Sequence, residues 1–156
     1  MMSQLDCCII FDIDGVIIDN TERIEKYGLN ENKEDFYSDR LMAFDKPREL
    51  GIKSLEEKKK VGKIVIVTGR PERVRKKTTQ ELSSFGVELK EIKIIFRPNN
   101  IDKIEEWKVK KILELRDSGC NICEVHEDSE EVIYMLKYKI KGTKFFLHKG
   151  NKVESI

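Results

Sequence analysis

Apolar residues gather in five short runs that alternate with longer amphipathic stretches. The short runs, rich in β-branched and aromatic residues, predict strands at Cys7–Phe11, Lys63–Val67, Ile92–Phe96, Ile122–Val125 and Lys144–Leu147. The stretches between them carry apolar residues at helical spacing and predict helices at Glu49–Lys60, Glu72–Phe85, Lys103–Arg116 and Glu130–Lys139. Glycines follow these helices at Gly62, Gly86, Gly119 and Gly142, as is common where helices end. The alternation predicts an α/β fold, a doubly wound parallel sheet with helices on both faces.

One segment interrupts the alternation. Residues 20–45, between the first strand and the next helix, are polar and charged, with a few scattered aromatic residues. This length is too short for an independent domain, and 156 residues suffice for one core. We therefore expect a single domain, 1–156, with a small insertion at 20–45 that is too short to roof a binding site.

Composition narrows the possible partners. The 30 basic residues nearly balance the 29 acidic ones, so no overall basic field points to nucleic acid or to a membrane surface. No segment approaches the roughly 18 consecutive apolar residues of a membrane-spanning helix. The first residues lack the pattern of a signal peptide. We expect a cytoplasmic protein without membrane contact, of an oligomeric state that the sequence leaves open.

The four cysteines fall in two pairs. Cys7 and Cys8 lie in the first apolar run, where cysteine acts as a small buried hydrophobe. Cys120 and Cys123 have CxxC spacing, but a zinc site needs a second ligand pair and a redox motif would precede a helix rather than a strand. We expect structural cysteines, with a Cys120–Cys123 disulfide as the alternative.

The most informative residues are Asp12 and Asp14, which end the first predicted strand and precede Gly15. Positions two apart share one face of a strand, so both carboxylates point the same way. Two like charges so close are unfavourable unless a cation or a proton separates them. The pair predicts a divalent metal site with one carboxylate free to act as a nucleophile. The alternative is a strand-end turn with a capping aspartate.

A second element, Thr68-Gly69-Arg70, ends the second predicted strand, and Pro71 then favours the start of a helix. A hydroxyl and free backbone N–H groups at such a turn form a cradle for phosphate, although an ordinary capped turn fits equally well.

Two further elements come from the second half of the chain. Glu127 and Asp128 end the fourth predicted strand, and their oxygens suit Mg²⁺, although a charge pair at a helix start is the commoner role. A lysine lies on the helix before that strand, either Lys108 or Lys110; a lone lysine on a helix is usually solvated. The elements are weak singly. Together they fall where doubly wound sheets bind ligands, outside the carboxyl ends of the strands.

These four elements, in this order, resemble the motifs of the haloacid dehalogenase-like phosphatase superfamily. The resemblance spans nearly the whole chain. It implies a Rossmann-like sheet of about five strands in the order 3-2-1-4-5 with at most a minimal cap. In that order the first and fourth strands are neighbours, so Asp12 and Asp128 would face each other.

Within the superfamily, the chain looks most like the 3′-phosphatase domain of polynucleotide kinase-phosphatases. That pattern has arginines at the positions of Arg23, Arg70 and Arg97, here taken as substrate-binding residues together with Gly69. It also has an acidic residue four positions before the motif lysine. Glu106 and Lys110 have this spacing, so we favour Lys110 over Lys108.

The chain departs from that pattern at two places. Val16 follows Gly15 where the family usually has threonine, and Glu127 stands where it often has aspartate. The Glu-Asp-Ser form also resembles sugar-phosphate phosphatases of the same superfamily. A small-metabolite phosphatase, or a phosphate- or nucleic-acid-binding module without turnover, therefore remains an alternative.

The resemblance implies a Mg²⁺-dependent phosphomonoester hydrolase acting on a phosphorylated partner, such as a nucleic-acid end. Asp12 would attack phosphorus to form an aspartyl-phosphate, and Asp14 would serve as acid and then base. Thr68 and Lys110 would hold phosphate oxygens. The implied metal ligands are Asp12, the Asp14 backbone carbonyl and Asp128, with Glu127 assisting.

Overall fold

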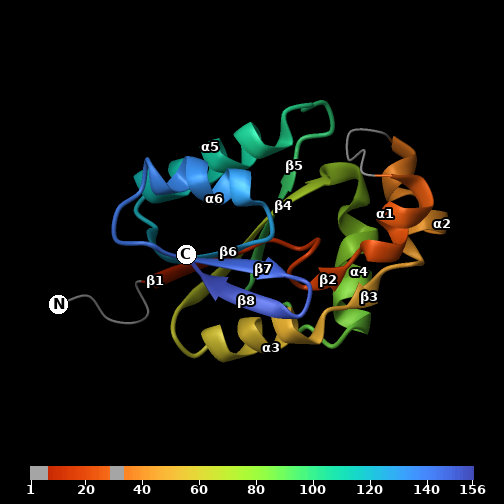
Figure 1. Cartoon of the computed structure of the whole chain (residues 1–156), viewed down its shortest axis with the longest axis horizontal. Helices are drawn as coiled ribbons and strands as arrows, with labels where there is room; N and C mark the ends of the chain where they lie inside the picture. The colour runs from red at the N-terminus through yellow and green to blue at the C-terminus, as the bar shows by residue number, and fades with distance from the viewer. Residues whose placement is uncertain (1–6, 29–33) are drawn as a thin grey trace.

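A six-stranded sheet forms the centre of the protein, shown as a computed structural model that describes residues 7–28 and 34–156 (Figure 1). Its strands are β1 (Cys7–Phe11), β4 (Lys63–Pro71), β5 (Lys93–Arg97), β6 (Asn121–Glu127), β7 (Lys144–Lys149) and β8 (Lys152–Ser155). They lie in the order β5-β4-β1-β6-β7-β8, and all neighbours are parallel except β7 and β8.

The α/β class and the mostly parallel, Rossmann-like sheet are confirmed, but the strand count and the order differ from the prediction by the added strand β8. Its sequence, Lys-Val-Glu-Ser, contains no apolar run, so no hydrophobic pattern marks it. It forms because the chain reverses after Lys149 and pairs with the free edge of β7. A second sheet of two-residue strands, β2 (Ile18–Asp19) and β3 (Lys46–Pro47), was likewise not predicted.

The four long helices lie where the amphipathic stretches predicted them. They are α3 (Glu49–Lys58), α4 (Arg75–Ser84), α5 (Ile104–Asp117) and α6 (Glu130–Lys137). The predicted start of the helix at Pro71 is wrong. Pro71 ends β4, and a 3-10 turn, η3 (Glu72–Val74), precedes α4. The register between β4 and β5 shifts between Thr68 and Pro71, which lets β4 continue past its apolar part.

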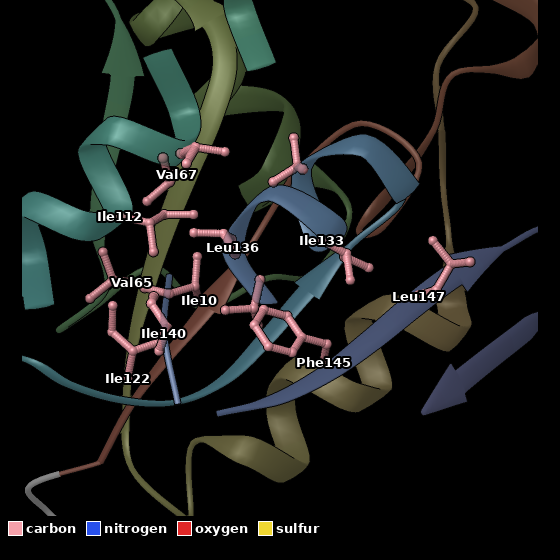
Figure 2. Close-up of a cluster of buried hydrophobic side chains, with 13 residues drawn as sticks. Ile10, Val65, Val67, Ile112, Ile122, Ile133, Leu136, Ile140, Phe145 and Leu147 are labelled. Carbon is pink, nitrogen blue, oxygen red and sulfur yellow. The ribbon is translucent and has the colours of Figure 1, made fainter. Parts of the chain in front are cut away.

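Two hydrophobic clusters hold the helices against opposite faces of the sheet. Ile10 of β1 packs with the helices α5 and α6, and Figure 2 shows Ile112 and Leu136 of those helices directed toward it. The next residues of β1 on either side, Ile9 and Phe11, face the helices α3 and α4. Burying each such side chain contributes about 1.5–3 kcal/mol. This alternation fixes the register of β1, and with it the direction in which Asp12 leaves the sheet.

The segment between β2 and β3 forms α1 (Thr21–Tyr27), a 3-10 turn η2 (Glu34–Tyr37) and α2 (Asp39–Met42). Phe36, Tyr37 and Met42 make a separate small cluster with Val74 of η3. This cluster places the segment next to the end of β4. Among the described residues, no helix has both the length and the apolar character needed to cross a membrane.

The cysteines pair differently from the Cys120–Cys123 alternative. Cys7 is bonded to Cys123 and Cys8 to Cys120, so both disulfides tie β1 to the β6 region. Side chains three apart in an extended segment point to opposite faces, which keeps Cys120 and Cys123 from meeting. Each instead meets a cysteine of the neighbouring strand.

Candidate active site

The order of the strands brings the predicted motifs to one edge of the sheet. β1 lies between β4 and β6, so their carboxyl ends converge around a cavity of about 280 Å³. The cavity is lined by Asp12, Asp14, Asn20, Ile24, Tyr37, Gly69, Ile104, Glu105, Lys108, Glu127, Asp128, Ser129 and Val132.

Asp12 is buried at the base of this cavity and held in place by three contacts. Its backbone N–H donates to the carbonyl of His126 on β6 at 3.0 Å. Its Oδ1 accepts from the backbone N–H of Ile13 at 2.8 Å and lies 3.1 Å from Nζ of Lys108. The backbone of Asp12 is thus fixed by β6, and its carboxylate is fixed by the Ile13 N–H and by Lys108 of α5.

Lys108, and not Lys110, is the lysine that the structure brings to Asp12, which corrects the preference drawn from spacing. Lys108 shares the inward face of α5 with Ile104 and Ile112, one turn away on either side, and is buried. Lys110 lies two positions further, on the opposite side of the helix, and is exposed. Burial opposes the charge of Lys108, but Asp12 and Glu127 outweigh it and raise its pKa well above the ordinary value.

Glu127 and Asp128 complete a cluster of three carboxylates. One oxygen each from Asp12, Glu127 and Asp128 lies within 4.8 Å of the others. Glu127 is buried, with Oε2 3.2 Å from Nζ of Lys108. Burial, together with the charge of Asp12, raises the pKa of Glu127 well above its usual range. Gly15 packs so closely against Asp128 that an added Cβ would overlap its carboxylate.

The donor set of this cluster fits a hard divalent cation. Three carboxylates gather around the single positive charge of Lys108, which leaves an excess of negative charge that a cation would offset. All the candidate ligand atoms are oxygens, which Mg²⁺ prefers. The side chain of Asp14 is not part of this cluster, because arginines hold it elsewhere.

Asp14 is held by two buried arginines. Arg23 Nη2 donates to its Oδ1 at 2.7 Å, and Arg70 donates to both oxygens at 2.8 and 3.0 Å. Burial raises the pKa of Asp14, but the charges of Arg70 and Arg23 outweigh burial and bring it well below the usual value. Asp14 is therefore ionised at neutral pH in this arrangement.

Behind these arginines lies Asp45, which no sequence pattern pointed to. Its Oδ1 accepts from Arg23 Nε at 3.0 Å and its Oδ2 from Arg70 Nη2 at 3.1 Å, and its side chain is fully buried. Burial and the charge of Asp14 raise its pKa to about 7, against the two arginines. Asp45 thus links both arginines that hold Asp14. Its sequence context, the end of a polar segment, carries no signal of this role.

The remaining predicted residues support the cavity rather than line it. The hydroxyl of Thr68 is buried and accepts from the backbone N–H of Arg70 at 3.0 Å. Arg97 is buried and donates from Nε to the carbonyl of Gly69 at 2.7 Å, which holds the turn that does line the cavity. Among the described lining residues none is an arginine, so Arg23, Arg70 and Arg97 are placed behind the surface on which we expected them.

The insertion contributes more than the sequence indicated. Asn20, Ile24 and Tyr37 form one wall of the cavity, which Ile104 of α5 and Val132 of α6 also line. The small insertion therefore narrows a site that we expected to be open. No motif marks these residues, since their contribution depends on how the insertion packs against the end of β4.

The fold of the protein is similar to that of chains in two solved structures. The chain matches a chain in a solved structure of the Pnkp1/Rnl/Hen1 RNA repair complex, with a TM-score of 0.70 and 18% identity, over 94% of this chain and 43% of that one. A second structure of the Pnkp1/Rnl/Hen1 complex matches with a TM-score of 0.68 and 17% identity, over 92% and 46%. The protein thus spans less than half of each matched chain. No protein-family model and no curated protein matches the sequence.

Proposed function

We propose that the protein is a Mg²⁺-dependent phosphomonoester hydrolase that acts through an aspartyl-phosphate on Asp12. The observation that carries the proposal is the ion pair of 3.1 Å between Lys108 and Asp12, at a cavity where Glu127 and Asp128 supply two more carboxylates. A nucleophilic carboxylate needs to be oriented, and the ammonium group of Lys108 holds that of Asp12 in place.

In the first step, an oxygen of Asp12 attacks phosphorus, the new O–P bond forms, and the bond to the leaving oxygen breaks. The charge of Lys108 offsets negative charge on the phosphoryl oxygens. Bound at Asp12, Asp128 and Glu127, Mg²⁺ would supply Lewis-acid stabilisation of the same charge. The contacts of Asp12 with Lys108 and with the Ile13 N–H keep its carboxylate in one orientation.

Asp14 is suited first of all to the second step. Because Arg23 and Arg70 favour its ionised form, Asp14 is already in the state that can accept a proton, although the same contacts weaken it as a base. It takes the proton of the water that attacks phosphorus, the bond between phosphorus and the Asp12 oxygen breaks, and inorganic phosphate leaves. Protonating the leaving oxygen in the first step requires Asp14 to carry a proton, and hence to weaken its contacts with these arginines. The contacts with Arg23 and Arg70 therefore set the balance between the acid and base roles of Asp14.

We propose a 3′-phosphorylated polynucleotide end as the substrate. The similarity of fold to chains of RNA repair complexes supports this. A second candidate, a small-metabolite phosphatase, is favoured by Ile24 and Tyr37, which line the same cavity as Asp12 and narrow it, because a narrow cavity suits a small molecule.

One panel tests the reaction and separates the two candidates. Release of inorganic phosphate is measured from a 3′-phosphorylated oligonucleotide, its 5′-phosphorylated counterpart and a set of sugar phosphates, with Mg²⁺ and with chelator. The proposal predicts fastest release from the 3′-phosphate, loss with chelator, and at least a 10³-fold loss in Asp12→Asn. The matched control is Asp117→Asn, an exposed aspartate at the end of α5. Chelator-independent turnover, or an active Asp12→Asn, would refute the mechanism.

A further inference from the structure

Unlike Tyr37, the other polar residue that the insertion places at the cavity, Asn20 has no side-chain partner among the described residues. It is 9% exposed and lines the cavity. Its carboxamide makes no hydrogen bond with any residue in the described ranges 7–28 and 34–156. No fully enclosed side-chain N or O atom of the described residues lacks a partner, so the Asn20 amide is open to the cavity. A ligand that covers this amide without bonding to it costs about 1–3 kcal/mol.

The local structure leaves this side chain available. Asn20 precedes α1, a position where asparagine usually accepts a hydrogen bond from a backbone N–H of the first turn. Here no such bond forms. Asp19 instead accepts from the backbone N–H of Thr21 at 3.0 Å. The carboxamide of Asn20 is therefore not needed to start the helix.

Its surroundings indicate which part of a substrate it meets. The charged residues that line the cavity lie on α5 or at and just after the ends of β1 and β6; they are Asp12, Asp14, Glu105, Lys108, Glu127 and Asp128. The wall that contains Asn20 is otherwise formed by Ile24 and Tyr37 and carries no charge. A phosphoryl group belongs beside Lys108. The uncharged wall then faces the sugar that carries the phosphate.

The cavity is large enough to hold a phosphoryl group beside Lys108 and a sugar at the uncharged wall. A volume of about 280 Å³ equals that of roughly nine water molecules. A phosphoryl group fills only part of it. The remainder accommodates a group of the size of a sugar ring against Ile24 and Tyr37. An amide both donates and accepts, as a sugar hydroxyl does.

We propose that Asn20 binds the hydroxyl on the carbon next to the phosphoester, so that the site selects ribonucleoside over 2′-deoxyribonucleoside 3′-phosphates. The 2′-hydroxyl is the group that distinguishes RNA from DNA at a given position. A bound deoxy ligand would cover the Asn20 amide without giving it a partner, and this cost lowers affinity. The inference rests on the proposed function, since it assumes that the phosphate is held at Asp12.

Binding, rather than turnover, tests this selectivity. In the Asp12→Asn protein with Mg²⁺, calorimetry compares adenosine 3′-monophosphate with 2′-deoxyadenosine 3′-monophosphate. We expect about tenfold tighter binding of the ribonucleotide. Adding Asn20→Ala should bring the ratio of the two dissociation constants to within twofold of one. The matched control Asn100→Ala, in an exposed loop outside the cavity lining, should keep the tenfold ratio.

Equal affinities in the parent protein would overturn the inference without any need for the variant. So would a tenfold preference that survives Asn20→Ala in a protein with a normal melting transition. If the wild-type protein hydrolyses phosphomonoesters but binds both nucleotides equally, only the inference fails. If it hydrolyses none of the phosphomonoester panel, the proposed function fails, and the inference fails with it.

Discussion

Replacing Gly15 with alanine tests whether Asp128 belongs to the reacting site. Gly15 has φ +83°, a conformation that costs an L-residue about 1–2 kcal/mol. An added Cβ would also lie 2.5 Å from Asp128 Cγ and closer still to Oδ2, where ordinary contact begins at 3.4 Å. The carboxylate of Asp128 must therefore retreat by about 1 Å, a displacement that costs on the order of 10²-fold in rate.

Gly86→Ala is the matched control. Gly86 has φ +88°, nearly the same conformation, and an added Cβ there meets no atom of the described residues within 4 Å. Both variants should lose similar stability from the backbone, about 1–2 kcal/mol, read as a lower melting temperature. The difference between them then isolates the contact with Asp128.

The assay measures phosphate release and the rise of the melting temperature with Mg²⁺. Gly15→Ala should lose about 10²-fold in kcat and most of the Mg²⁺-dependent stabilisation, while Gly86→Ala keeps both. If Gly15→Ala turns over substrate as fast as Gly86→Ala and responds equally to Mg²⁺, the assignment of Asp128 to the metal site is wrong.

Three other perturbations test separate parts of the account. Lys108→Met should lower kcat by at least 10²-fold and Lys110→Met should leave it unchanged, and equal rates in both would contradict the placement of the lysine. Burial lowers the pKa of His126 to about 4 and of His148 to about 3, so the unfolded state takes up protons first as pH falls below 6.5. The free energy of unfolding should fall by about 2–3 kcal/mol per histidine at pH 4.5, and His148→Gln, compared with the parent by urea unfolding, should reduce this fall. Reducing the two disulfides, which close loops of more than 100 residues, should lower stability by about 2–5 kcal/mol in thermal melts, whereas four alkylatable thiols in the unreduced, denatured protein would rule the disulfides out.

The parts of the fold and site that the sequence predicted are those with a local pattern. The alternation around Ile10 places Asp12 at the end of a buried strand, and the run before Glu127 does the same for β6. A sheet in which these strands are neighbours then brings the carboxylates together. Strand β8 escaped prediction because it is defined by pairing with β7 rather than by apolar residues.

The parts that the sequence did not reveal depend on tertiary packing. The apolar stripe of α5 fits Lys108 on its inward face, but the spacing from a resemblance favoured Lys110. Asp45 and Asn20 lie in or beside a polar insertion whose sequence gives no periodicity, so their contacts exist only after the insertion packs against the end of β4. The roles of Arg23 and Arg70 also depend on packing. Their positions in the sequence suggested phosphate binding, but both are buried and bind Asp14.

The central claim is that Asp12 itself carries the phosphoryl group during turnover. The protein is mixed with a 3′-phosphorylated oligonucleotide and Mg²⁺, quenched in acid within one turnover, digested and analysed by mass spectrometry. The account predicts a phosphate on the peptide that contains Asp12, absent in Asp12→Asn and without Mg²⁺. Phosphate release that proceeds through a burst with no phosphorylated peptide, or with the phosphate on another residue, would contradict it.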